Sequence, residues 1–320
     1  MVRPFRTLTV IATVVTVSVM TIVNVAPASP ASSSLSNSIA AARQIARVSP
    51  IAPDPRRLNV ATPWLYSGLK YAVQEKCFRA GDLATLAAPK PCMGGDTNSA
   101  TTIVIFGDSS VGSWTPALRA AGKTYHWRVA SFQYEACAMA FLAAVAPTCR
   151  QFHQALPDAI AKLQPAVVIG VGGTAYSKQS VDTVFAAGVE KAVNAIRAKS
   201  PSAQYVVWGT TPQLPLPAAT CLNARPTSMN TCGVSVGSRL VQSGPYSATE
   251  ARDRRSADLA QATFVPVEQW FCANGWCPAV VDHTLVYADF MHVSERYSQL
   301  LAPSVGEIIR GILNSGSSAT

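Results

Sequence analysis

The feature that most constrains the fold is the alternation of short β-branched apolar runs with amphipathic stretches over residues 101–315. The apolar runs predict buried strands at 102–106, 127–131, 166–171, 204–208 and 263–267. Helical periodicity predicts helices at 114–121, 154–163, 181–198, 249–259 and 294–313. Strands that alternate with helices form a parallel sheet covered on both faces. We therefore expect an α/β fold, a three-layer α/β/α flavodoxin-like domain with a central five-stranded parallel sheet.

Composition supports a folded chain with one large domain. Of the 320 residues, 49% are hydrophobic and only 13% are charged, about half the usual share for soluble domains, so disorder is excluded as the main state. Residues 101–315 form the expected main domain. Residues 57–100 are expected to be an N-terminal extension stapled by a disulfide. Residues 29–56 begin with a stretch of Ser, Ala, Pro and Asn, and are expected to form a flexible linker.

The first 28 residues have the pattern of an export segment. Arg3 and Arg6 precede an apolar stretch at 7–23, which small residues follow up to Ala28. This stretch is slightly long for a signal peptide and slightly short for a spanning helix, so both a signal peptide and an uncleaved N-terminal membrane anchor stay open. We expect the chain to be secreted or anchored at the outer face of the cytoplasmic membrane.

The cysteine count agrees with export, because an even number in an exported chain predicts disulfides. The eight cysteines are Cys77, Cys92, Cys137, Cys149, Cys221, Cys232, Cys272 and Cys277. They allow 105 connectivities. Our working hypothesis pairs nearest neighbours (77–92, 137–149, 221–232 and 272–277), which staples short loops. Without a Cys-x-x-Cys and with only four histidines, the chain is expected to hold neither a metal nor a cofactor.

The formal net charge of +9 does not by itself indicate nucleic-acid binding. The basic residues are scattered, and no run of five or six Lys or Arg occurs. A basic surface also suits the anionic lipids and polymers of a cell envelope. We expect an envelope partner and no nucleic acid.

The first candidate for chemistry follows the first predicted strand, where the chain has Gly107-Asp108-Ser109-Ser110. Glycine allows the tight turn, and backbone N–H groups at the start of a helix can hold an oxyanion. Asp and Ser are also favoured helix N-caps, so this junction alone more often has a structural role.

The second candidate precedes the last predicted helix, at Tyr287-Ala-Asp-Phe-Met-His-Val-Ser294. Asp289 and His292 are three residues apart, so the carboxylate can accept from the imidazole and leave its other nitrogen free as a base. Helix capping and a satisfied histidine are the alternatives for each residue alone. A serine needs such a base to become nucleophilic, so the two motifs together favour a serine site.

These motifs resemble the SGNH (GDS-type) hydrolases, most closely the extracytoplasmic SGNH domains associated with integral-membrane carbohydrate O-acyltransferases. The resemblance covers roughly residues 77 to 313. The block around Ser109 with Trp114 five residues later matches, as does Tyr287-x-Asp289-x-x-His292-hydrophobic-Ser294. The spacing of Cys92, Cys137, Cys149 and Cys277-Pro278 agrees as well.

The resemblance implies Ser109 as nucleophile, His292 as general base and acid, and Asp289 as the carboxylate that orients it. The family often has His after the serine, where this chain has Ser110, which stays an alternative nucleophile. The wider family also has an Asn after the third strand, where this chain has Gly172-Gly173-Thr174. The oxyanion candidates are therefore Ser109, Gly172, Gly173 and Thr174. Substrate-contact candidates are Asp108, Trp114 and Tyr176. Two alternatives stay open for Trp270 and Trp276, which flank Cys272: stacking on a sugar face, or packing, which is more common in a disulfide loop.

The expected function is that of an extracytoplasmic serine-dependent O-acyltransferase or acyl esterase. It moves a short acyl group, expected to be acetyl, on an envelope carbohydrate or glycolipid through an acyl-Ser109 intermediate. A separate integral-membrane acyltransferase is the expected source of the acyl donor. The alternative is a non-catalytic carbohydrate-binding or scaffold protein that keeps the same fold.

Overall fold

The computed structural model describes residues 30–58, 62–77, 88–173, 182–238 and 246–317. The export segment at 1–28 lies outside these residues. Within the described ranges, no helix combines the length and the apolar character needed to span a membrane.

The core is a six-stranded sheet in the order β1-β3-β2-β4-β5-β7. Its strands are β1 (Cys92–Gly95), β2 (Thr102–Gly107), β3 (Arg128–Gln133), β4 (Val167–Val171), β5 (Gln204–Trp208) and β7 (Thr263–Val265). Five of them are parallel, and β1 pairs antiparallel with β3 at one edge. The predicted five-stranded parallel sheet is confirmed, and its order is the flavodoxin-like one.

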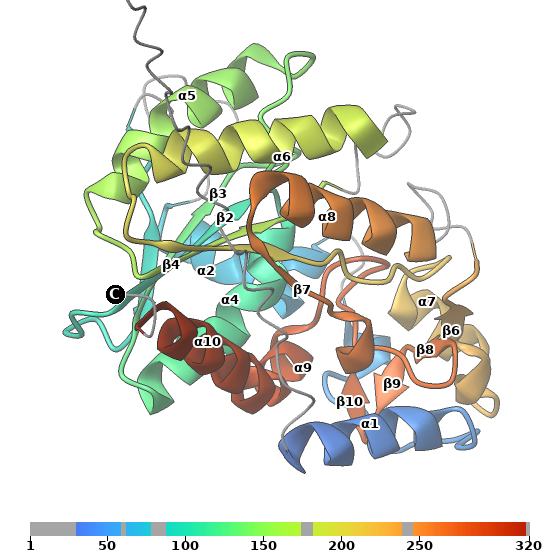
Figure 1. Ribbon diagram of the computed structural model, residues 1–320. Helices are drawn as coiled ribbons and strands as arrows, with labels where there is room; N and C mark the ends of the chain where they lie inside the picture. The colour runs from blue at the N-terminus through green and yellow to red at the C-terminus, as the bar shows by residue number, and fades with distance from the viewer. Residues whose placement is uncertain (1–29, 59–61, 78–87, 174–181, 239–245, 318–320) are drawn as a thin grey trace, which may run out of the picture.

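Helices cover both faces of this sheet, as the view along its edge shows (Figure 1). One face carries α4 (Ser110–Thr124), α9 (Glu295–Leu300) and α10 (Ala302–Ser317), and the other carries α5 (Pro147–Ala161), α6 (Asp182–Arg197) and α8 (Tyr246–Ala260). Side chains of β2 alternate between the two layers: Ile103 and Ile105 join the α4 side, while Val104 and Phe106 join the α5 side. Burial on both faces explains why this strand is apolar throughout.

Smaller elements surround the carboxyl ends and one flank of the sheet. They are α1 (Pro30–Ala42), α2 (Leu69–Gln74), α7 (Ala218–Ala224), the strand pairs β6 (Gly233–Ser235) with β8 (Trp276–Pro278) and β9 (Val280–Val281) with β10 (Thr284–Leu285), and the single turns η1 (Pro55–Arg57), η2 (Pro63–Tyr66), η4 (Met229–Thr231) and η5 (Glu268–Trp270).

The expectation of a flexible linker at 29–56 is wrong for the described part of this range. Helix α1 occupies its first half, and Ile39, which is 1% exposed, packs into the main core together with Leu35 and Ile51. Leu35 and Ile39 are four residues apart and share one helix face. Their burial outweighs the high content of Ser and Pro around them.

Two further differences have local causes. The predicted closing helix at 294–313 is two helices, α9 and α10, which meet at Leu301; Pro303, in the first turn of α10, has no N–H to bond back into α9. Strand β1 was not predicted because half of it is glycine. A Cβ on Gly94 would come within 2.5 Å of the Arg119 side chain, so the sequence there is set by close packing.

All eight cysteines are paired, as the nearest-neighbour hypothesis predicts. The disulfides are Cys77–Cys92, Cys137–Cys149, Cys221–Cys232 and Cys272–Cys277. Each closes a short loop around the sheet and leaves the strand order unconstrained.

Candidate active site

Ser109 stands at the turn that joins the central strand β2 to helix α4, where it is the N-cap residue. The turn requires glycine at position 107, where φ is +150° and where a Cβ would lie 1.9 Å from the Val171 carbonyl oxygen. The strand therefore runs close beside β4 and delivers a half-buried Ser109 at the carboxyl edge of the sheet.

His292 and Asp289 lie in a tight turn that precedes α9. The Ala288 N–H donates to the His292 carbonyl at 2.8 Å, and Asp289 Oδ1 accepts the N–H groups of Met291 and His292, both at 2.7 Å. Asp289 Oδ2 lies 2.6 Å from His292 Nδ1. A carboxylate only accepts, so Nδ1 carries the hydrogen and Nε2 is left as an acceptor.

The structure brings together the three residues that the motifs single out. His292 Nε2 lies 2.9 Å from Ser109 Oγ, across a separation of 183 residues in the chain. The two segments are also joined by the Val293 N–H, which donates to Ser113 Oγ at 3.1 Å. The side chains of His292 and Asp289 are 16% and 14% exposed, so the site opens to solvent.

The electrostatics of the pair favour a charged imidazole next to a carboxylate. Burial opposes the charge on His292, but the hydrogen bond and charge of Asp289, with the charges of Asp108 and Glu135, outweigh it and raise the pKa of His292. Burial likewise opposes the charge on Asp289, yet His292 and the two backbone N–H groups hold the pKa of that carboxyl below its usual range.

Asp108 has a structural position rather than a substrate-facing one. It is 3% exposed, and its two carboxylate oxygens accept the N–H groups of Ser110 at 2.8 Å and of Gly173 at 2.9 Å. Burial raises the pKa of Asp108, although the Ser110 hydroxyl, these two N–H groups and the charge of His292 oppose the rise. The carboxylate is thus committed to joining the ends of β2 and β4, which corrects the expectation of substrate contact.

Within the described residues, the structure also divides the oxyanion candidates into those with a free N–H group and those without one. The Gly173 N–H is already bonded to Asp108, so it is not free to bind an oxyanion. Gly172 has φ +95°, and a Cβ there would lie 2.3 Å from Asp108 Oδ1, so this residue must be glycine. Ser109 and Gly172 remain as the described candidates, while Thr174 lies outside the described residues.

The aromatic candidates belong to the core as far as they are described. Trp114 is 1% exposed, and its ring centroid lies 5.3 Å from that of Trp208 and 5.6 Å from that of Trp270. Trp114 therefore packs α4 against the core, and the expectation that it contacts substrate is corrected. Trp270 packs in the core, the more common of its two alternatives. Tyr176 lies outside the described residues.

Sequence reasoning missed a buried ion pair behind the Gly172–Gly173 loop, formed by Arg252 and Asp253 of α8. It also missed Glu135, whose charge acts on His292. No motif marks these three residues. Charged residues in an amphipathic helix or a loop are usually solvent-exposed, so only the folded structure distinguishes them.

Two groups of residues within the described ranges have the proximity of metal ligands, Cys137 with Cys149 and His153, and Glu75 with Cys77 and Cys92. The four cysteines are all in disulfides, so they supply no thiolate. Burial lowers the pKa of His153 to about 4, which keeps this imidazole neutral. Neither group fits a metal ion.

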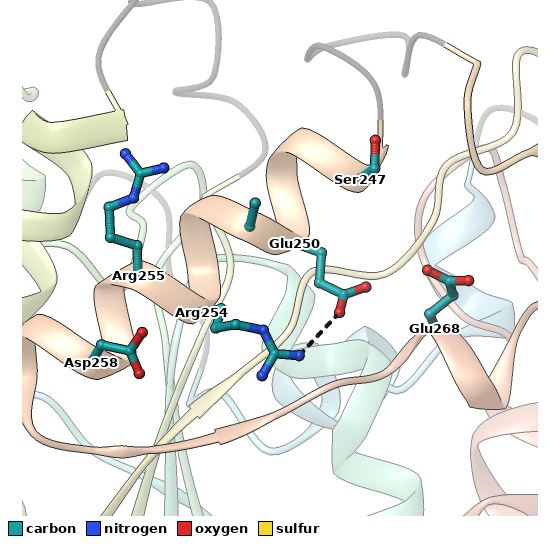
Figure 2. Close-up of a pocket in the computed structure, with 7 residues that line it drawn as sticks. Ser247, Glu250, Arg254, Arg255, Asp258 and Glu268 are labelled. Carbon is teal, nitrogen blue, oxygen red and sulfur yellow. Dashed lines mark ion pairs between the residues drawn. The ribbon is translucent and has the colours of Figure 1, made fainter.

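A separate groove of about 520 Å³ runs along the outer side of α8 (Figure 2). Glu250 lies between Arg254, with which it pairs at 3.6 Å, and Glu268. Burial and the neighbouring Glu250 raise the pKa of Glu268. The groove is lined by none of Ser109, Asp289 and His292, so it is a surface feature apart from the serine site.

Comparison with known proteins identifies the family. The family model described as "SGNH domain (fused to AT3 domains)" matches residues 76–307. The periplasmic domain of a lipopolysaccharide acetyltransferase from Salmonella ser. Paratyphi A has a similar structure. Its TM-score is 0.59 at 14% identity, over 79% of this chain and 98% of that chain. This likeness shows a shared fold.

Two structures from Sinorhizobium meliloti match with lower scores. The carbohydrate acetylesterase Est24 has a TM-score of 0.45 at 14% identity, over 66% of this chain and 99% of its own. Another carbohydrate acetylesterase family member has a TM-score of 0.41 at 12% identity, over 67% and 99%. No curated protein matches the chain. Because the family model spans most of its length, the chain belongs to the SGNH family of acyl hydrolases and acyltransferases.

Proposed function

We propose that the protein is an O-acyltransferase or acyl esterase that works through an acyl-Ser109 intermediate on a carbohydrate of the cell envelope. The observation that carries this proposal is the line of contacts from Asp289 through His292 to Ser109, at 2.6 Å and 2.9 Å. These are the distances that a nucleophile, its base and an orienting carboxylate require.

In the first half-reaction, Ser109 Oγ attacks the carbonyl carbon of the acyl donor while His292 Nε2 takes the hydroxyl proton. Asp289 holds the imidazole in the correct tautomer and stabilises the imidazolium that forms. The N–H groups of Ser109 and Gly172 are the proposed donors to the oxyanion. The protonated His292 then gives its proton to the leaving oxygen, the bond to that oxygen breaks, and the acyl group stays on Ser109.

In the second half-reaction, a hydroxyl group attacks the acyl-enzyme. His292 takes its proton, the Ser109 ester bond breaks, and the proton returns to Ser109 Oγ. Water as the acceptor makes the protein an esterase, whereas a sugar hydroxyl makes it a transferase. The description of the family as fused to AT3 domains supports transfer, with a membrane acyltransferase as the source of the donor.

The four disulfides support a location outside the cytoplasm, where such bonds persist. The export pattern at 1–28 supports the same location, either secreted or anchored at the outer face of the membrane. The periplasmic domain of the Salmonella acetyltransferase has this fold as well. Envelope carbohydrate or glycolipid is the proposed acceptor because such polymers surround a protein in this place.

The first test compares hydrolysis of a chromogenic acetyl ester by the wild type, Ser109→Ala and Ser110→Ala. We expect Ser109→Ala to lose about 10³-fold or more in kcat, because loss of a triad nucleophile removes the covalent route. Ser110→Ala separates the two adjacent serines and should lose about ten-fold or less. Equal rates for the wild type and Ser109→Ala contradict the proposal and favour the binding or scaffold alternative.

A further inference from the structure

Helix α8 contains a buried ion pair made by two consecutive residues. Arg252 is 3% exposed and Asp253 is 0% exposed, and the Nε and Nη2 atoms of Arg252 donate to Asp253 Oδ1 at 3.0 Å and 2.7 Å. Adjacent residues on a helix normally point in different directions. Burying two charges also costs desolvation that their attraction often fails to recover. Stability alone is therefore a weak reason for this pair.

The pair contacts the loops that follow two neighbouring strands. Arg252 Nη1 donates to the Gly173 carbonyl after β4 at 3.4 Å, and Nη2 lies 3.5 Å from Thr210 Oγ1 after β5. Asp253 Oδ2 accepts the Thr210 N–H at 2.9 Å. The guanidinium also lies over the Phe185 ring, 4.0 Å from its centre, as in a cation–π contact.

The Gly173 contact leads to the nucleophile. While its carbonyl accepts from Arg252, the Gly173 N–H donates to Asp108, whose other oxygen accepts the Ser110 N–H at the start of α4. Gly173 itself lies against Phe185, because a Cβ there would come within 2.4 Å of the ring. The loop is thus held between Asp108 on one side and Arg252 with Phe185 on the other.

The Thr210 contact leads to the acid–base segment. In the loop that begins with Thr210, the N–H of Leu214 donates to the Phe290 carbonyl at 2.7 Å. At the start of α7, which follows this loop, the N–H of Ala218 donates to the Asp289 carbonyl at 3.1 Å. The Arg252–Asp253 pair is therefore linked through hydrogen-bonded loops both to the element that carries Ser109 and to the one that carries Asp289 and His292.

We propose that Arg252 is a positioning residue of the reaction. It holds the Gly172–Gly173 loop so that the Gly172 N–H can donate a hydrogen bond to the transition-state oxyanion. In the wider family, an Asn side chain donates this hydrogen bond. Through Thr210 it also keeps this loop in register with the His292 segment. The inference rests on the proposed function. It assigns the role of the absent Asn side chain to the backbone N–H of Gly172, which Arg252 of α8 positions.

The test measures Arg252→Lys and Arg252→Met against Arg119→Met as a matched control. Arg119 also binds a carboxylate through two nitrogens, those to Glu75 at 2.6 Å and 2.7 Å, but it lies on the far part of α4. Active sites are counted by labelling with a fluorophosphonate, so that kcat is expressed per competent serine. An alkyl boronic acid, which forms a tetrahedral anion on a serine, reports oxyanion stabilisation independently of turnover.

We expect kcat per labelled site to fall about ten-fold in Arg252→Lys and about 100-fold in Arg252→Met, as for the loss or misplacement of an oxyanion donor. KM should stay within about two-fold while the boronic acid inhibition constant rises in parallel with the loss of kcat. Arg119→Met should keep kcat within about two-fold. A lower melting temperature in Arg252→Met with unchanged kcat and unchanged boronic acid affinity means a purely structural role and overturns the inference.

If neither Arg252 variant folds, Thr210→Val replaces them, because it removes only the hydroxyl that contacts Arg252. It should lower kcat by about three-fold and weaken boronic acid binding by the same factor; an unchanged value of either contradicts the inference. Failure of the proposed function has a different signature, since the wild type would then show no labelling at Ser109.

Discussion

At the scale of single residues, the charges around His292 decide the pH at which the site can work. Asp289 bonds the ring directly, and Asp108 and Glu135 add negative charge, so the pKa of His292 lies above the ordinary value for histidine. A general base must be neutral in order to accept the proton of Ser109. The active form is therefore lost as the pH falls through this raised pKa.

We predict that kcat/KM for an acetyl ester falls on the acid side with a midpoint above about pH 6.5, the value of an unperturbed histidine. Glu135→Gln removes one of the charges that raise the pKa of His292, so it should move this midpoint to lower pH and leave the plateau unchanged. The profile is measured from pH 5 to 9, with Glu307→Gln as a control on the distant helix α10. A midpoint below about pH 6.5 contradicts the raised pKa of His292, and an unchanged midpoint in Glu135→Gln contradicts the contribution of the Glu135 charge.

Which residues could be predicted depends on whether their chemistry has a local pattern. Asp289 and His292 lie within one turn and Ser109 follows a strand, so spacing and the family blocks single them out. Arg252 and Asp253 have no such pattern, because only the third dimension shows that two charges in an amphipathic helix are buried. Trp114 and Asp108 lie in the family blocks, where Trp114 packs in the core and Asp108 joins two strands. The motif alone does not distinguish these structural roles from substrate contact.

At the scale of elements, hydrophobic periodicity predicts the strands and helices that form the core, and few of the other elements. Strands β2 and β4 are buried at every position because both faces of the sheet are covered there, so they give the clearest signal. Helix α1 and strand β1 form because they pack against the main domain. Their sequences are rich in Ser or Gly and show no periodicity that would predict them. The division between α9 and α10 gives no such signal, because a proline alone does not mark a break: α4 and α5 run through Pro116 and Pro157.

The N-cap of α9 connects element stability with the site. Ser294 is buried, its Oγ accepts the Tyr297 N–H at 3.2 Å, and it donates to the Leu285 carbonyl. We predict that Ser294→Ala lowers the free energy of unfolding by about 1–3 kcal/mol, because the helix loses its cap and a buried carbonyl loses its donor. Denaturant unfolding measures the change, with the peripheral Ser315→Ala as control, expected within about 0.5 kcal/mol. Equal stabilities for the two variants speak against the capping role.

At the scale of the whole molecule, the site is a product of chain topology. The first parallel strand supplies Ser109, the last segment before α9 supplies His292, and the carboxyl ends of β4 and β5 supply the loops between them. Parallel strands bring such loops to one edge of the sheet, where ligands bind in open α/β folds. The four disulfides each close a short loop of the chain.

The central claim is a covalent acyl group on Ser109, and mass spectrometry of the trapped protein tests it most directly. The full chain is mixed with a chromogenic acetyl ester, quenched in acid during turnover, and digested for peptide mapping. We expect a gain of about 42 Da, one acetyl group, on the peptide that contains Ser109, and no gain in Ser109→Ala. Turnover without an adduct on Ser109, or an adduct on another residue that Ser109→Ala retains, contradicts the account.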